Sequence, residues 1–236
     1  MNDQASDTLA ALAATDFIDA DHPAIRAFAA EVIGNLTDPR EQAVALYYAV
    51  RDRLRYDPYT VDLSDHALKA STTLLAGRGW CQPKATLLAA ACRAVGVPAR
   101  VGFADVRNHL STERLRQVMQ TDTYYWHGYT AILLDGRWVK ATPAFNIELC
   151  QKFQLQPLEF DGREDSIYHP FDLSGNRHME YVNLRGDFDD VPITAIREDF
   201  ARYYPQMMGL DTAANLGADF DADVEAEIAI KPLASS

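Results

Sequence analysis

The sequence predicts an α+β fold, with helices first and an antiparallel hairpin after them. Helical periodicity with clear start and stop signals occupies much of residues 21–56, and a well-marked helix follows Cys81. Two strand-like stretches then flank the dipeptide Asp135-Gly136, which is a strong hairpin signal. Helices and strands that are segregated along a chain are typical of the α+β class.

The size of the chain allows one substantial core. Its 236 residues are 48% hydrophobic and 24% charged, which is a globular composition. We expect a single domain over residues 1–236, with an acidic C-terminal segment, 212–236, that is loosely held. No internal repeat or low-complexity linker divides the sequence.

Two amphipathic helices are predicted in the first quarter of the chain. Residues 21–35 begin with an Asp-x-Pro entry signal and stop at a Gly-Asn pair. Residues 38–56 begin with Asp38 as N-cap and carry Glu41 at the capping-box position. Each segment has apolar residues on one face, so each is expected to cover a core.

The best marked helix begins close to Cys81. Pro83 suits its first turn, and Gly96 followed by Pro98 ends it. Apolar side chains recur along one face: Leu87, Leu88, Ala91 and Val95. A short helical turn at 70–79 precedes it, so the start of the helix is pinned near Cys81.

Strands are expected after this helix. Residues 99–106 alternate between apolar and polar side chains, and residues 123–143 read as a strand, a two-residue turn and a second strand. Short helices are expected at 111–120 and at 193–205. Beyond Phe145 the remaining pattern is weak.

The charge of the chain restricts its partners. The net charge is −12 and the pI is near 4.8, with acidic residues spread along the sequence. No basic stripe is available to neutralise phosphates or anionic lipids. We therefore expect no nucleic acid and no membrane partner. Without a signal peptide or an apolar run of about 20 residues, the protein is expected to be cytoplasmic. Its oligomeric state stays open.

Three cysteines, Cys81, Cys92 and Cys150, lie at wide spacings, which favours reduced thiols over disulfides or zinc ligands. No metal or cofactor is expected. Cys81 differs from the others because it opens a helix, where unpaired N–H groups and the helix dipole favour a thiolate and can bind an oxyanion. The alternative is an ordinary small buried residue.

His127 is the first candidate for a base that serves Cys81. It lies on the first strand of the hairpin, where a rigid element can hold an imidazole against a helix terminus. The alternative is a half-buried histidine that pairs across the hairpin. His169 and His178 rank second, because they lie in a glycine-containing loop rich in aromatic residues. The other histidines are expected to be solvated: His22, His66 and His109.

Two segments within residues 70–146 resemble a known family. The stretches GWCQPKATLLAAACRAVGVPARVGF and WHGYTAILLDGRWVKATP are similar to the core of the transglutaminase-like superfamily, which is related to papain-type cysteine proteases by circular permutation. In that family a cysteine opens a central helix, and a histidine begins a hairpin whose second strand usually carries an aspartate. The resemblance implies that the Cys81 helix packs on an antiparallel sheet, with the N-terminal helices around it.

The resemblance also implies roles for individual residues. Cys81 is then the nucleophile and His127 the base. Thr142 stands where the family usually has aspartate, and Asn146, four residues on, is the alternative orienter of the imidazole. A neutral third member can fix the tautomer of His127, but it stabilises the imidazolium less than a carboxylate does.

Other residues are candidates for the cleft. The backbone N–H of Cys81 and the side-chain amide of Gln82 are the candidate oxyanion donors. Trp80 or Trp126 can wall the cleft and exclude water, and the alternative for both tryptophans is core packing.

The expected function is a thiol-dependent hydrolase or acyl transferase that acts on a peptide or amide. The thiolate would attack the carbonyl, the histidine would protonate the leaving group, and water or an amine would resolve the thioester. The alternative is a catalytically degenerate transglutaminase-like binding or scaffold module, which the threonine at position 142 favours.

Overall fold

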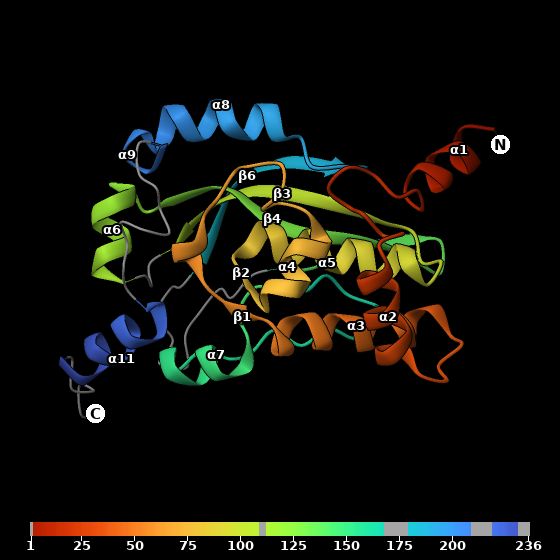
Figure 1. Ribbon diagram of the computed structural model, residues 1–236, viewed down its shortest axis with the longest axis horizontal. Coiled ribbons are helices and arrows are strands. Elements are labelled where there is room, and N and C mark those ends of the chain that lie inside the picture. The colour runs from red at the N-terminus through yellow and green to blue at the C-terminus, as the bar shows by residue number, and fades with distance from the viewer. Residues whose placement is uncertain (1, 109–111, 168–178, 209–218, 231–236) are drawn as a thin grey trace.

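The computed structural model describes residues 2–108, 112–167, 179–208 and 219–230 (Figure 1). The helices are α1 (Asn2–Ala10), α2 (Pro23–Ile33), α3 (Pro39–Arg53), α4 (Ala70–Ala76), α5 (Cys81–Ala94), α6 (Glu113–Met119), α7 (Ile147–Phe153), α8 (Ile193–Tyr203), α9 (Pro205–Met208) and α11 (Phe220–Ile230), with a 3₁₀ turn η1 (Pro58–Thr60). The strands are β1 (Arg55–Tyr56), β2 (Arg78–Gly79), β3 (Ala99–Asn108), β4 (Thr123–Leu134), β5 (Arg137–Ala141) and β6 (Met179–Phe188).

Four strands form an antiparallel sheet in the order β5-β4-β3-β6. The predicted hairpin is confirmed: Leu134 pairs with Arg137, and the two turn residues between them both have positive φ, 50° at Asp135 and 75° at Gly136. Positive φ at both central positions is the requirement of the tight hairpin turn that Asp-Gly favours. Helices packed on this sheet confirm the α+β fold class.

Helix α5 lies between the sheet and the layer formed by α2, α3 and α4 (Figure 1). Every residue from Cys81 to Arg93 is buried, so this helix has no solvent-exposed face. The apolar stripe at Leu87, Leu88 and Ala91 was predicted, but the burial of the opposite face was not. A helix that is covered on both sides must satisfy its polar side chains internally, and α5 does so through hydrogen bonds to backbone carbonyls.

The two short strands β1 and β2 pair in parallel, with Tyr56 opposite Gly79. This pairing ties the end of α3 to the residues directly before Cys81. The start of α3 is as predicted, because Asp38 accepts hydrogen bonds from the N–H groups of Arg40 and Glu41. At α2 the capping side chain is His22, whose Nδ1 accepts from Ala24 N–H, and not the preceding aspartate.

Several elements were not foreseen, among them β6, α7 and α11. Strand β6 is an edge strand with exposed residues at its centre, Val182 and Leu184 among them, so it lacks the alternation that marks a half-buried strand. Helix α7 follows the hairpin. Helix α11 lies within the segment expected to be loosely held, and its Phe220 packs on Tyr56 and Tyr59 at ring-centroid distances of 5.9 and 5.3 Å. Aromatic contacts therefore hold this part of the C-terminal segment in place.

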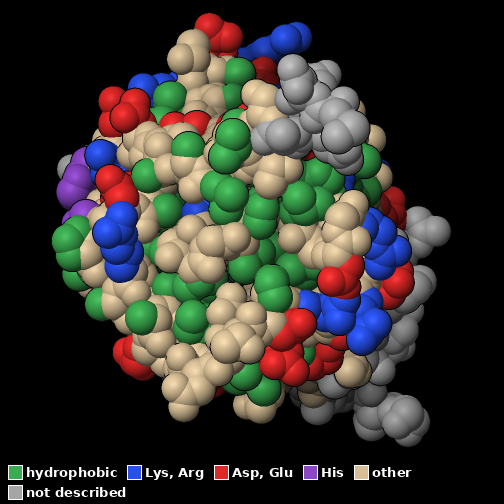
Figure 2. All heavy atoms as spheres, turned by 90° about the vertical axis from the view of Figure 1, so that its right-hand side faces the viewer, with side chains coloured by type: hydrophobic (Ala, Val, Ile, Leu, Met, Phe, Trp, Pro, Cys, Tyr) green, Lys and Arg blue, Asp and Glu red, His purple; other side chains and the backbone are tan. Residues whose placement is uncertain are grey.

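Charged side chains of both signs lie side by side on the face shown in Figure 2, around a centre with many hydrophobic atoms. Among the described residues, no helix combines the length and the apolar character needed to cross a bilayer.

Candidate active site

Cys81 is the first residue of α5, and only 5% of its surface is exposed. The helix has no side-chain cap, because Trp80 occupies the N-cap position. The first N–H groups of the helix are therefore open to other acceptors. Backbone N–H groups of Gly128, Gln82 and Cys81 itself lie near the sulfur and act to lower the pKa of the thiol. The thiol thus lies in a nest of amide donors contributed by α5 and β4.

Burial raises the pKa of Cys81 to about 11, while these three N–H groups act to lower it. This is opposite to the direction expected from the helix terminus alone. A helix N-terminus stabilises an adjacent anion by about 0.3–2 kcal/mol. Complete desolvation of a thiolate costs more than that, so the closed site favours the neutral thiol.

His127 lies on β4 and is 3% exposed. Together with Cys81 it lines a cavity of about 40 Å³. The two residues come from elements separated in sequence and are brought to one small space by the packing of β4 on α5. The structure therefore places the predicted nucleophile and base on a shared cavity.

Two contacts fix β4 on the start of α5. Gly128, directly after His127, packs so closely that an added Cβ would come within 2.8 Å of the Cα of Gln82. The side chain of Gln82 is buried, and its Nε2 donates to the carbonyl oxygen of Trp126 at 2.9 Å. The amide of Gln82 was expected as an oxyanion donor. In the structure it joins the helix to the strand, and it is absent from the described lining of the cavity.

Aromatic side chains enclose the cavity. Its lining includes Tyr56, Trp80, Phe200 and Tyr204, and the ring of Phe200 lies 6.0 Å from that of Trp80 and 4.9 Å from that of Tyr204. Phe200 belongs to α8 and Tyr204 follows it directly, so this end of the molecule covers the thiol. Of the two predicted wall residues, Trp80 lines the cavity.

Trp126 packs elsewhere. Its ring lies against Phe103 at 5.4 Å and Phe188 at 6.3 Å. Its indole Nε1 donates to Asp199 at 2.9 Å. This tryptophan has the core-packing role that was its alternative.

A larger cavity of about 660 Å³ adjoins the small one. The two share Val61, Trp80, Phe200 and Met207 in their lining. The larger cavity has a mixed lining, with Arg78 and Arg197 beside these apolar side chains.

Thr142 and His127 line a third space, of about 10 Å³, which is roughly the room that one water molecule needs. The hydroxyl of Thr142 donates to the carbonyl oxygen of Ile167 at 3.0 Å. This bond uses the one hydrogen of the hydroxyl and leaves its oxygen lone pairs to accept. Thr142 is therefore placed near the imidazole with acceptor capacity to spare.

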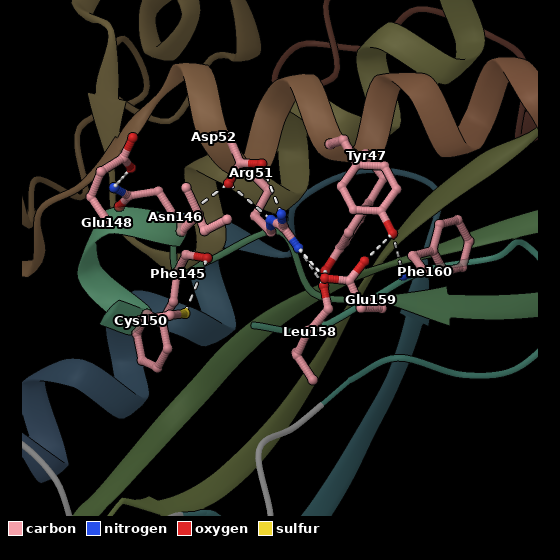
Figure 3. A network of polar contacts seen from close by, with 12 residues as sticks. Tyr47, Arg51, Asp52, Phe145, Asn146, Glu148, Cys150, Leu158, Glu159 and Phe160 are labelled. Atoms are coloured by element: carbon pink, nitrogen blue, oxygen red, sulfur yellow. Dashed lines mark hydrogen bonds and ion pairs between the residues drawn. The ribbon is translucent and has the colours of Figure 1, made fainter. Parts of the chain in front are cut away.

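Asn146 has a different environment (Figure 3). Its Oδ1 accepts from Tyr56 N–H at 3.0 Å, and its Nδ2 donates to Glu148 at 2.8 Å. Nearby, Arg51 makes two hydrogen bonds to Asp52 and one to the carbonyl of Leu158, as Figure 3 shows. Asn146 thus ties the segment after β5 to β1, while the N–H of the next residue, Ile147, donates to Asp52 of α3 at 3.1 Å.

The remaining predicted residues divide into two groups. Cys92 and Cys150 are buried, and burial raises the pKa of each thiol to about 12. His169 and His178, the second candidates for the base, lie outside the described residues, as does His109.

Sequence reasoning missed Lys84, which lies one turn after Cys81 and is fully buried. Its Nζ donates to the carbonyl oxygens of Arg51 at 2.9 Å, Leu54 at 2.7 Å and Ala144 at 2.8 Å. The first two carbonyls belong to the end of α3, where a cation is favourable. Lys84 therefore joins three segments beneath the site. The signal was present as a cation in the first turns of a largely apolar helix.

Comparisons with known proteins agree with this architecture. Residues 26–143, half of the chain, match the family model of the Transglutaminase-like superfamily. The chain belongs to this superfamily, whose members are in general cysteine-dependent hydrolases and transferases. A search of curated proteins found no match.

Two solved structures are similar to the chain. One is a candidate cysteine protease from Cytophaga hutchinsonii, with 18% identity and a TM-score of 0.47 over 79% of this chain and 50% of that one. The other is a candidate protease from Parabacteroides distasonis ATCC 8503, with 16% identity and a TM-score of 0.35 over 49% of this chain and 22% of that one. The chain thus spans half or less of the length of these proteins.

Proposed function

We propose that the protein is a thiol-dependent hydrolase or acyl transferase that acts on a peptide or amide, with Cys81 as nucleophile and His127 as base. The observation that supports this most directly is the shared cavity, which the two side chains line from α5 and β4. The amide donors around the sulfur add the electrostatic environment that acyl transfer requires.

The reaction starts from the neutral thiol, because burial raises the pKa of Cys81. His127 accepts the thiol proton as sulfur attacks the carbonyl carbon, and the N–H groups at the start of α5 stabilise the oxyanion that forms. The protonated imidazole then gives its proton to the leaving amine, which leaves a thioester on Cys81. Water or a second amine attacks the thioester, and His127 accepts the proton of that nucleophile. The C–S bond then breaks, which releases the acid or the new amide, and the imidazolium returns the proton to the Cys81 sulfur.

Thr142 acts as a neutral third member in this proposal. Its oxygen accepts from the ring N–H of His127, directly or through one water in the 10 Å³ space between them. The bond from its hydroxyl to the Ile167 carbonyl keeps the oxygen oriented as an acceptor. Such a contact fixes the tautomer of the imidazole without adding a charge.

A second function deserves a test because the thiol is so well covered. A cavity of about 40 Å³ is far too small for a peptide, and pKa elevation disfavours the thiolate. These two observations favour a degenerate module that keeps the fold and binds without turnover.

Alkylation by iodoacetamide between pH 5.5 and 9, followed by peptide mapping, separates the two readings. Cys92 and Cys150 are internal references, and His127→Ala is the matched variant. For an enzyme, Cys81 should react at least tenfold faster than both references at pH 7, and His127→Ala should remove this advantage. The native protein should also release p-nitrophenol from p-nitrophenyl acyl esters, and Cys81→Ser should not.

Equal labelling of the three cysteines, or a Cys81 rate that does not depend on His127, would remove the enzyme assignment. Preferential labelling without ester turnover would support the binding module. Ester turnover that rises when a primary amine is added would identify a transferase.

A further inference from the structure

Strand β4 contains a bulge directly before His127. Where β4 pairs with β3, Tyr125 and Trp126 together lie opposite the single residue Asp105. Trp126 has φ +61°, in the left-handed region that residues with a Cβ adopt rarely. An extra residue of this kind increases the local twist and changes the direction of the side chains that follow.

The bulge sets the faces of the strand residues that come before His127. In a regular strand, residues three apart lie on opposite faces of the sheet. Tyr124 and His127 are three apart, yet they pair with Val106 and Ala104 of β3, which are two apart and share a face. An extra residue between them reverses the alternation and brings both to one side. His127 itself pairs with Ala104 at the start of a regular ladder that runs to Ile132, so the bulge directly adjoins the residue whose imidazole lines the cavity.

Asp105 satisfies the amide that the bulge removes from the ladder. Its carboxylate accepts from Trp126 N–H at 3.1 Å, and the residue is 4% exposed. The carbonyl oxygen of Trp126 accepts a second hydrogen bond, from Nε2 of Gln82. Both backbone groups of the strained residue are therefore held by side chains, one from β3 and one from α5.

The charge of Asp105 is compensated. Arg185 on β6 donates to it from Nε at 2.5 Å, and Asn183 donates at 3.3 Å. The guanidinium of Arg185 also lies 4.3 Å from the ring of Trp126 and donates to Asp199 at 2.6 Å. Asp199 in turn accepts from the indole of Trp126. The bulge is thus held at both the backbone and the ring.

We propose that Asp105 is a positioning residue, which holds the bulge at Trp126 and thereby fixes the backbone directly before His127, from which the imidazole serves Cys81. The inference rests on the proposed function, because it assigns Asp105 an effect through His127. Asp105 does not line the cavity and does not itself contact the reacting atoms.

A double-mutant cycle tests this role. The rate of Cys81 alkylation by iodoacetamide is measured against pH in the native protein, Asp105→Ala, His127→Ala and the double variant. Asp105→Ala should lower the rate at pH 7 about tenfold and move the pH profile toward that of His127→Ala. In the His127→Ala background, Asp105→Ala should change nothing further. Asp105→Asn keeps an acceptor for Trp126 N–H and should retain most of the native rate.

Asp187→Ala is the matched control. Asp187 lies on β6 and accepts from Tyr129 at 2.6 Å, so its loss removes one partly buried hydrogen bond of the same sheet away from the bulge. It should leave the pH profile unchanged. An equal effect of Asp105→Ala with and without His127, or no effect in either background, would overturn the proposal. If Asp105→Ala changed the rate of Cys81 alkylation and His127→Ala did not, both the positioning role and the proposed function would be overturned.

Asp105→Ala leaves Arg185 without its partner, and this variant can fail to fold. The second form of the test is therefore Asp105→Val combined with Arg185→Met, which removes the acceptor and its counter-charge together. The same shift of the pH profile is expected in this pair, with circular dichroism as the check on folding. A native profile in the folded pair would contradict the positioning role.

Discussion

Gly128 on β4 lies directly against Gln82 on α5: a Cβ added to Gly128 would come within 2.8 Å of the Cα of Gln82 and 3.1 Å of the Cys81 carbonyl oxygen. Both neighbours are backbone atoms, which cannot move aside as the end of a flexible side chain can. Only glycine permits this approach, and the approach brings the strand of His127 onto the start of the Cys81 helix.

Gly128→Ala should therefore separate the two elements and disable the site. We expect a loss of stability of about 1–3 kcal/mol from overpacking. We also expect a fall in Cys81 alkylation at pH 7 of up to about 100-fold, because misplacement by about 1 Å can have that effect on catalysis. Thermal unfolding and iodoacetamide labelling measure the two effects. Gly102→Ala is the control, since its Cβ would meet the ring of Tyr129, which packs in a separate core cluster. A native labelling rate in folded Gly128→Ala would contradict this expectation.

Met207→Ala should increase access to Cys81. Met207 is 6% exposed and lines both the small cavity and the large one, so its truncation joins them. We expect Cys81 alkylation to become several-fold faster, with a stability loss of about 2 kcal/mol. Ile196→Ala on α8 is the matched control, because Ile196 is fully buried and does not line either cavity. Equal acceleration by the control would mean that labelling proceeds through local unfolding instead.

Thr142→Asp should extend Cys81 reactivity to lower pH. A carboxylate near His127 raises the pKa of the imidazole and stabilises the thiolate-imidazolium pair, and a unit of pKa corresponds to about 1.4 kcal/mol. We expect the alkylation profile to move down by about one pH unit. Thr142→Val is the control: like aspartate it removes the donor to Ile167, at a cost of about 1 kcal/mol, but it adds no charge. An identical profile in the two variants would remove Thr142 from the site.

Lys84 should make the protein more stable as the pH rises from 7 to 8.5. Burial lowers the pKa of Lys84 from 10.5 to about 7. Between these values the unfolded chain binds one more proton than the folded one, so stability increases with pH at up to about 1.4 kcal/mol per unit. The gain over this window is about 1.5 kcal/mol. Denaturant unfolding at several pH values measures it.

Lys84→Met should lack that gain, and it should also be less stable because three carbonyls lose their donor. Above about pH 8.5 the buried thiols act in the opposite direction, since burial raises their pKa values, so the comparison stops there. Parallel pH curves for the native protein and Lys84→Met would show that Lys84 does not titrate in this range.

Local signals made much of the architecture predictable. Asp38 caps α3, a proline and a glycine bracket the central helix, and Asp135-Gly136 turns the hairpin, each as its short-range chemistry requires. Strand β6 and helix α11 were not predicted, because they lack such local signals. An exposed edge strand has no alternation, and the packing of Phe220 on Tyr56 joins residues far apart in the chain.

The sequence by itself determined where Cys81 and His127 stand on their elements, because helix starts and hairpin turns depend on neighbouring residues. Only the tertiary structure decided how these elements meet. The contact at Gly128, the bulge that Asp105 holds, the bond between Asn146 and Tyr56 and the burial that raises the pKa of Cys81 all depend on atoms distant in sequence. Hydrogen bonds and desolvation act through space, so a local pattern can name a thiol and an imidazole but cannot give the environment that sets their protonation.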